Sequence, residues 1–260
     1  MSETPLLSVS DLTKHYGQRI GCDAVSFALW SGEVLAVVGE SGSGKSTLLS
    51  CLWGDLTPTR GTVHYSGADG VVRDMGGLSE AERRVIQRTE WGFVRQNAAE
   101  GLRMGVSAGG NVGERLMAVG ARHYGAIRQS AAEWLTRVEI DPARMDEAPS
   151  AFSGGMRQRL QIARNLVTEP RLMFMDEPTS GLDVSVQARL LDLLRSLTRD
   201  LGLAVIIVTH DLGVARLLSD RIMVMCAGRV IETGLTDQVL DDPSEPYTQL
   251  LVASVLEVAG

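Results

Sequence analysis

The sequence contains few cysteines and no excess of basic residues. Cys22, Cys51 and Cys226 are the only cysteines among 260 residues, and none of them forms a C-x-x-C pair. This number and spacing exclude a disulfide framework and a cysteine metal site, and they are typical of a reduced cytosolic protein. Aspartate plus glutamate number 32 against 25 lysine plus arginine, which gives a net charge of −7. Because no basic stripe is present to neutralise phosphates, we expect no nucleic-acid partner.

Long apolar segments are also absent. The longest apolar runs span a handful of residues, far short of the roughly 20 that a bilayer-spanning helix needs. Residues 1–5 have neither a basic start nor the apolar core of a signal peptide. We therefore expect a soluble, cytoplasmic protein that meets a membrane only through a partner. With 44% hydrophobic residues, the chain can build a sizeable core.

A phosphate-binding sequence is present near the N-terminus. Residues 39–46, Gly-Glu-Ser-Gly-Ser-Gly-Lys-Ser, match G-x-x-x-x-G-K-[ST] and follow an apolar run at 34–38. Such glycines let the loop turn its N–H groups around a polyphosphate, and the following helix adds its positive dipole end. Lys45 would reach the β- and γ-phosphates, and Ser46 would bind Mg²⁺. The nucleotide-binding residues expected here are Gly39, Glu40, Ser41, Gly42, Ser43, Gly44, Lys45, Ser46 and Thr47.

Two carboxylates follow a second apolar run. Residues 172–175 are typical of a buried parallel strand, and Asp176 and Glu177 come directly after them. Ligands of open α/β sheets bind at this carboxyl edge. In a phosphate-loop NTPase, Asp176 would hold Mg²⁺ and Glu177 would polarise the attacking water. A core strand followed by an acidic turn would explain the segment equally well, but the upstream phosphate loop favours a catalytic site.

A glycine-rich helix start lies between these two segments. Ser153 is a plausible N-cap, and Gly154 and Gly155 leave the neighbouring N–H groups open to an anion. Taken alone, this is an ordinary capped helix. The order of the three segments, however, resembles the nucleotide-binding subunits of ATP-binding cassette (ABC) proteins, whose signature is close to Leu-Ser-Gly-Gly-Gln. Phe152 and Met156 depart from that signature, while its Ser-Gly-Gly core is intact.

The resemblance to ABC proteins implies four further site residues. Tyr16 occupies the place of the aromatic residue that stacks on adenine. Gln96 matches the glutamine that senses Mg²⁺ and water, and His210 matches the histidine that contacts the γ-phosphate. Asp183 matches a loop that crosses the dimer. Without the resemblance, Tyr16 would be explained as a packing residue and His210 as a capping group.

The implied fold class is α/β: an ABC nucleotide-binding domain with a phosphate-loop NTPase core sheet, an antiparallel β subdomain and an inserted helical subdomain. We expect one domain over 1–260, with the ATP-binding core at about 1–96 and 168–260 and the helical subdomain at about 97–167. Local patterns predict short strands in 6–30, a hairpin in 61–72 and a strand at 221–226. They also predict helices at 79–87, 112–119, 126–138, 185–201, 212–219 and from about 247.

A single chain of this kind is incomplete. The Ser153 helix start cannot readily fold back onto its own phosphate loop, and in ABC proteins two chains pair head to tail. The resemblance therefore implies an ATP-dependent homodimer in which Ser153 of one chain meets the ATP held by Lys45 of the other. ATP hydrolysis to ADP and phosphate would use Lys45, Glu177 and His210, with Mg²⁺ held through Ser46, Gln96 and Asp176.

A narrower resemblance concerns the partner. Residues 107–117, 120–125, 152–156 and 235–255 resemble ATP-binding proteins of the carbon–phosphorus lyase system, which breaks down organic phosphonates. This implies a soluble lyase core complex as partner, with a second ABC ATPase of the same system as a further candidate. Residues 97–110 depart from the importer pattern and are rich in small residues, so we expect them to lie closely against a partner's backbone.

Two other function classes remain. Residues 245–251 are shared with oligopeptide-importer ATPases, so the chain could instead energise a membrane importer of peptides, phosphonates or similar solutes. A third class, soluble ABC proteins that act on ribosomes or DNA, usually carries two cassettes or a long coiled-coil insertion. This acidic single cassette has neither feature.

Overall fold

The core of the protein is a six-stranded sheet. The structure is a computed structural model that describes residues 4–258. The strand order is β10-β9-β3-β8-β7-β6, and only β10 runs antiparallel to its neighbour. β3 and β8 are buried along their whole length, as expected of parallel strands covered on both faces. The strands are β3 Val34–Val38, β6 Trp91–Val94, β7 Leu172–Asp176, β8 Ala204–Thr209, β9 Arg221–Cys226 and β10 Arg229–Leu235.

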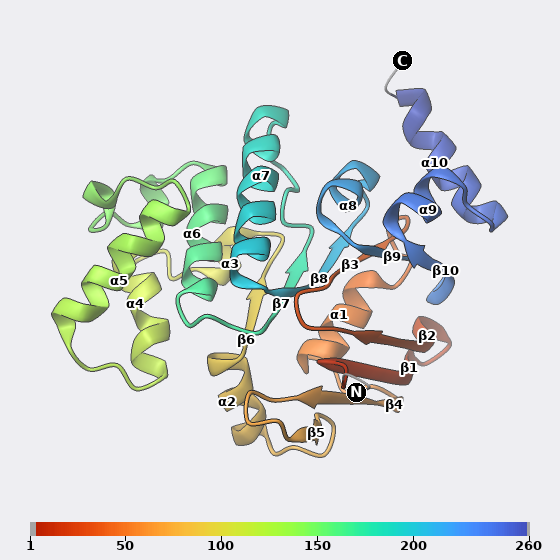
Figure 1. Cartoon of the computed structure of the whole chain (residues 1–260), viewed down its shortest axis with the longest axis horizontal. Coiled ribbons are helices and arrows are strands. Elements are labelled where there is room, and N and C mark those ends of the chain that lie inside the picture. The colour runs from red at the N-terminus through yellow and green to blue at the C-terminus, as the bar shows by residue number, and fades with distance from the viewer. Residues whose placement is uncertain (1–3, 259–260) are drawn as a thin grey trace.

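A four-stranded antiparallel sheet lies beside this core, below it in Figure 1. Its order is β2-β1-β4-β5, with β1 Leu7–Tyr16, β2 Arg19–Leu29, β4 Arg60–Ser66 and β5 Val72–Asp74. The short strands expected in residues 6–30 are in fact two long ones, joined by a two-residue turn at Gly17, whose φ is +61°. The predicted hairpin in 61–72 is confirmed by the pairing of β4 with β5.

Helix α1, Lys45–Trp53, packs between the two sheets. Leu48 and Leu49 belong to one apolar cluster with Leu12 of the antiparallel sheet and Ile206 of the core sheet. Because the helix contacts a sheet on each side, it has apolar residues toward both sheets. The packing fixes the start of the helix, and hence the phosphate loop, relative to both sheets.

The segment of residues 97–167 is helical and contains no strand, as predicted. Its α-helices lie together at the left of Figure 1, away from the antiparallel sheet. Trp134, Leu135 and Leu160 join the same apolar cluster as Met173 of the core sheet, which attaches the helical part to the core. The segment comprises α3 Ala98–Gly101, α4 Ala108–Ala118, α5 Tyr124–Arg137, the 3₁₀ turns η1 Pro142–Arg144 and η2 Pro149–Ala151, and α6 Gly154–Leu166.

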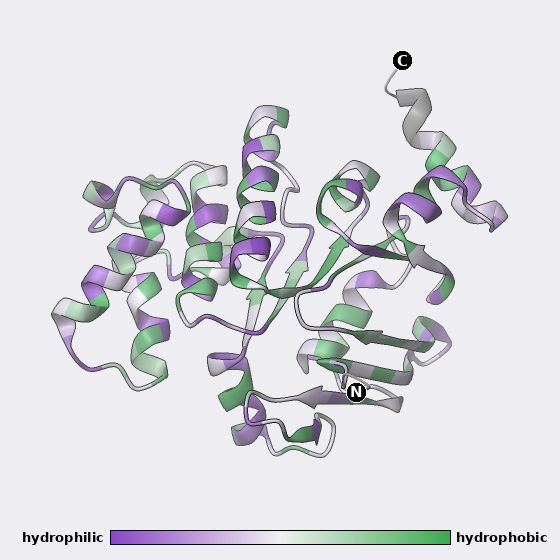
Figure 2. Ribbon diagram, viewed as in Figure 1, coloured by the Kyte–Doolittle hydropathy of each residue, from purple (hydrophilic) through white to green (hydrophobic). Residues whose placement is uncertain are grey.

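The remaining helices cover the edges and outer faces of the sheets. Hydrophobic residues follow the central strands and polar residues follow the outer turns of the helices (Figure 2). Within the described residues, no helix is both long and apolar enough to cross a bilayer. These helices are α2 Glu80–Thr89, α7 Val184–Leu201, α8 Leu212–Leu218, α9 Thr236–Asp241 and α10 Pro246–Val258.

Candidate functional site

The phosphate loop between β3 and α1 is held by contacts that only glycine permits. A Cβ on Gly39 would lie 2.2 Å from the carbonyl oxygen of Met225 in β9. A Cβ on Gly44 would lie 2.2 Å from the carbonyl oxygen of Gly21 in β2. Both glycines also have positive φ, of +147° and +105°. The loop is therefore fixed between the core sheet and the antiparallel sheet, with its N–H groups left to face a ligand.

Lys45 folds over this loop. Its Nζ donates hydrogen bonds to the carbonyl oxygens of Gly39 at 2.7 Å and Glu40 at 2.8 Å. Burial lowers the pKa of the Lys45 ammonium, and the charges of Glu177 and Asp176 partly oppose that shift. A buried ammonium group whose hydrogen bonds go to neutral carbonyl oxygens is unfavourable, and a bound phosphate would stabilise its charge.

Hard oxygen donors gather next to Lys45. The Ser46 hydroxyl donates to Asp176 Oδ1 at 3.3 Å, and Gln96 Nε2 donates to Ser180 Oγ at 3.1 Å, which leaves the amide oxygen of Gln96 available. Burial raises the pKa of the Asp176 carboxyl above its usual value, against the hydrogen bond from Ser46. These donors fit Mg²⁺, which takes few protein ligands besides phosphate and water oxygens and would neutralise phosphate charge when bound.

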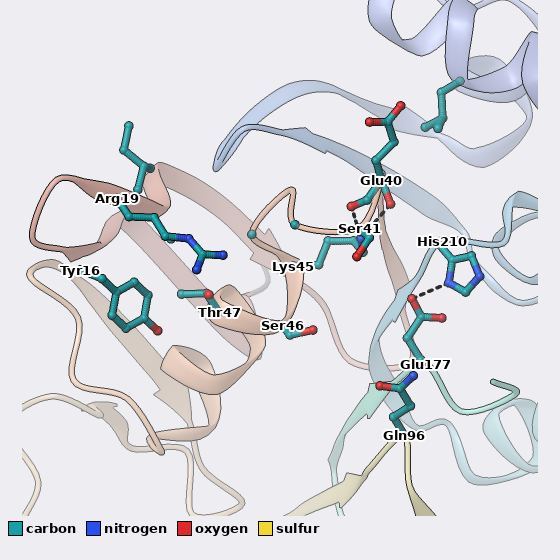
Figure 3. A pocket seen from close by; sticks show the side chains of 16 residues that line it. Tyr16, Arg19, Glu40, Ser41, Lys45, Ser46, Thr47, Gln96, Glu177 and His210 are labelled. Atoms are coloured by element: carbon teal, nitrogen blue, oxygen red, sulfur yellow. Dashed lines mark hydrogen bonds and ion pairs between the residues drawn. The ribbon is translucent and has the colours of Figure 1, made fainter. Parts of the chain in front are cut away.

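Glu177 and His210 approach each other at the opposite wall (Figure 3). Glu177 Oε1 lies 2.8 Å from His210 Nδ1, and Thr209 Oγ1 lies 3.5 Å from the other carboxylate oxygen. The Glu177 side chain is 13% exposed, whereas that of His210 is 63% exposed. A mostly buried carboxylate that is oriented by a more exposed imidazole can accept a proton from a water molecule that lies between the two side chains and a ligand.

These side chains line one cavity of about 670 Å³. The predicted residues that it collects are Tyr16, Gln96, Glu177, His210 and every phosphate-loop residue from 39 to 47 except Ser43. Asp176 does not line the cavity itself, but it accepts a hydrogen bond from Ser46, which does. Tyr16 is 45% exposed, and the Lys14 ammonium lies over its ring, 5.4 Å from the ring centroid.

Four lining residues were not predicted. Arg19, Ile20 and Gly21 come from the start of β2, and Leu251 comes from α10. The turn after Tyr16 offered a signal for the first three, since a hairpin returns its second strand beside the first. No local signal connects Leu251 with a phosphate loop about 200 residues earlier.

The predicted signature and dimer-loop residues, Ser153, Gly154, Gly155 and Asp183, lie outside this cavity. Ser153 Oγ accepts the N–H of Met156 at 3.3 Å and caps α6, as predicted. Asp183 Oδ1 accepts the N–H of Val186 at 2.9 Å and caps α7. Gly154 lines a smaller cavity of about 320 Å³ that it shares with Gln96. Within one chain, the helix start of α6 therefore does not meet the phosphate loop.

Comparison with known proteins agrees with this geometry. A family model described as ABC transporter matches residues 22–180. The chain is 64% identical to the putative phosphonates utilization ATP-binding protein PhnK of Escherichia coli strain K12, over 97% of the chain and 98% of that relative. It is 37% identical to the dipeptide transport ATP-binding protein DppF of the same strain, over 97% of the chain and 77% of that relative. The chain belongs to the ABC ATPase family.

Solved structures of ABC proteins share the fold. The dimeric post-hydrolysis state of the ATP-binding cassette MJ0796, bound to ADP and Pi, superposes with a TM-score of 0.78 at 30% identity. The superposition covers 88% of this chain and 98% of the MJ0796 chain. The predicted fold class and ATPase activity of this ABC ATPase are therefore confirmed. The roles of single residues remain predictions, for which the cavity supplies the geometry.

Proposed function

We propose that this ABC ATPase works in the cytoplasm as a head-to-tail homodimer and couples ATP hydrolysis to the carbon–phosphorus lyase complex in phosphonate catabolism. The observation that carries the proposal is the 64% identity to a phosphonates utilization ATP-binding protein over nearly the whole of both chains. The division of the chain into an ATP-binding core and a helical subdomain at about 97–167 is part of this proposal.

In the proposed mechanism, each residue has a task that its position permits. Lys45 and the N–H groups of the phosphate loop bind the β- and γ-phosphates. Glu177 accepts a proton from the attacking water, and His210 orients the Glu177 carboxylate through the 2.8 Å contact. Ser153 of the second chain supplies the α6 start to the γ-phosphate, since its own phosphate loop lies elsewhere. Loss of the γ-phosphate removes that bridge and opens the dimer.

The proposed partner surface is formed by the segment after Gln96. Asn97, Glu100 and Val106 are exposed there, and Asn97 also lines the cavity that Gln96 shares with the start of α6. Two glycines of this segment lie close to other parts of the same chain. A Cβ on Gly101 would lie 2.2 Å from Gln161 Oε1, and one on Gly109 would lie 2.3 Å from Met145 Cγ. Gly101 and Gly109 therefore pack within the chain, and the exposed side chains of the segment are the proposed contacts.

The test is co-purification from cells that grow on a phosphonate, with and without a non-hydrolysable ATP analogue. We expect soluble lyase subunits to be recovered, in amounts that depend on the nucleotide. A Lys45→Ala variant serves as the control, because it should lose the nucleotide dependence while it keeps its fold.

The second candidate is the ATPase subunit of a peptide or phosphonate importer. The identity of 37% to a dipeptide transport ATP-binding protein favours it. Recovery of membrane permease subunits in place of soluble lyase subunits would select this function and contradict the first.

A further inference from the structure

Arg19 is a charged residue of the nucleotide cavity without an assigned role. It is the first residue of β2 and pairs with Tyr16 across the hairpin turn. Figure 3 shows it beside Tyr16, with its guanidinium group turned toward Thr47. Within the side chains that the structure describes, this group makes no hydrogen bond or ion pair. An arginine directed into a cavity without a protein partner is available to a ligand.

The backbone that carries Arg19 is locked against the phosphate loop. Gly21, two residues further along β2, lies so close to α1 that an added Cβ would be 2.7 Å from Thr47 Cγ2 and 2.9 Å from Tyr16. The Gly21 carbonyl oxygen in turn lies against Gly44, as described above. The start of β2 therefore keeps a fixed distance to the helix start, and the arginine is part of the site rather than a distant surface residue.

The order of residues along the cavity indicates which part of a bound nucleotide Arg19 would face. Lys45, Glu177 and His210 mark the end that would receive the γ-phosphate, and Tyr16 marks the end that would receive the base. Thr47 lies one residue beyond Ser46, on the side of the hairpin (Figure 3). Arg19 and Thr47 therefore lie between the two ends, where the phosphate next to the ribose belongs.

We propose that Arg19 binds the α-phosphate of the nucleotide. A guanidinium group forms short, charge-assisted hydrogen bonds to phosphate oxygens and keeps its charge at every physiological pH. The α-phosphate is present in ATP and in ADP, so the contact raises the affinity for both nucleotides equally and leaves the hydrolytic step unchanged. The inference rests on the proposed roles of Lys45 and Tyr16 in binding the nucleotide.

The experiment compares equilibrium binding of a non-hydrolysable ATP analogue, ADP and adenosine to the full chain. Arg19→Gln should weaken the analogue and ADP by the same factor, about five- to tenfold, and leave adenosine unchanged. Arg19→Lys should lose less, because it keeps the charge without the planar fork. In steady-state turnover, Arg19→Gln should raise KM and keep kcat. Arg195→Gln, an exposed arginine on α7, is the matched control and should change nothing.

Three results would overturn the proposal. Unchanged affinities of Arg19→Gln, with wild-type melting behaviour, would mean that the guanidinium makes no contact. A loss for the ATP analogue but not for ADP would place it at the γ-phosphate. An equal loss for adenosine would place it at the base or the ribose. Failure of the wild-type chain to bind any nucleotide would instead contradict the proposed function itself.

Discussion

Glu177 adopts a φ of +45°, a conformation that costs a residue with a Cβ about 1–3 kcal/mol. Of the non-glycine residues with positive φ in the described chain, it is the one that lines the nucleotide cavity. The backbone is held there by the N–H of Glu177, which donates to Val208 of the neighbouring strand at 2.9 Å. The sheet thus maintains a strained conformation that brings the carboxylate to His210.

Glu177→Gln should bind ATP and barely hydrolyse it. The amide keeps the size of the side chain but cannot accept the proton of the attacking water, so turnover should fall about 100-fold or more. Size-exclusion chromatography with ATP should show an accumulated dimer. Glu169→Gln is the matched control, since Glu169 is exposed, lies outside the cavity and shares the positive φ. Wild-type turnover of the Glu177 variant would assign the proton acceptor to another group.

Asp176→Asn should stabilise the free protein while it impairs nucleotide hydrolysis. Burial and the neighbouring Glu177 charge raise the pKa of Asp176, so at pH 7 the folded state holds an unfavourable carboxylate. Its removal should therefore raise the free energy of unfolding. As the pH falls below the raised pKa, the folded wild type takes up the proton and the difference should shrink, and it should vanish once the pH is also below the pKa of the unfolded chain. Thermal melting of both proteins across pH measures this.

The exposed Asp192 on α7 gives the control for that comparison. Asp192→Asn should change the melting temperature little at any pH, because its carboxylate is solvated in both states. An Asp176 variant that melts below the wild type at pH 7 would show that the hydrogen bond from Ser46 outweighs the cost of burial.

At the scale of helices and strands, the sequence predicted best those features that depend on a few neighbouring residues, such as the start of a helix. The helix predicted at 79–87 is α2, and Ser79 and Glu82 form a capping box at its start. Each side chain accepts the other residue's backbone N–H, at 3.3 Å for Ser79 Oγ and 2.9 Å for Glu82 Oε2. In contrast, β10 and α9 were not predicted. β10 is a partly exposed edge strand without clear alternation, and α9 is a short helix without a side-chain cap. β10 forms by pairing with β9, and α9 packs against β10 and β9; the sequence reveals neither contact.

Ser79→Ala should therefore weaken α2. Loss of the cap leaves a helix N–H group unpaired and should cost about 1 kcal/mol, which corresponds to a melting temperature lower by about 2–4 °C for a protein of this size. Ser196→Ala is the matched control, because Ser196 lies inside α7 on an exposed face, where alanine favours the helix. Equal melting of the two variants would contradict the capping role.

At the scale of the whole molecule, the order of motifs predicted which distant segments meet. The sequence placed the phosphate loop, Gln96, Glu177 and His210 at strand ends, and parallel pairing brings these ends to one edge. The turn after Tyr16 offered a signal for Arg19 that was not used, whereas Leu251 could not be predicted, because the approach of α10 to that edge depends on tertiary packing. Nor can one chain complete the predicted site, since Ser153 lies outside the cavity that holds Lys45.

That separation leads to a prediction about two chains. Lys45→Ala should be inactive because its loop cannot hold the phosphates, and Ser153→Arg should be inactive because the larger side chain obstructs the α6 start. Mixed in equal amounts, they should regain up to about a quarter of the wild-type sites, since random pairing makes half of the dimers mixed and each mixed dimer holds one intact pair. ATPase assays of the mixture measure the recovery.

The control mixes the Lys45→Ala chain with a chain that carries both substitutions. This mixture should show no recovered activity, because no intact pair of Lys45 and Ser153 can then form. A mixture that stays inactive although both variants fold and dimerise would contradict head-to-tail pairing.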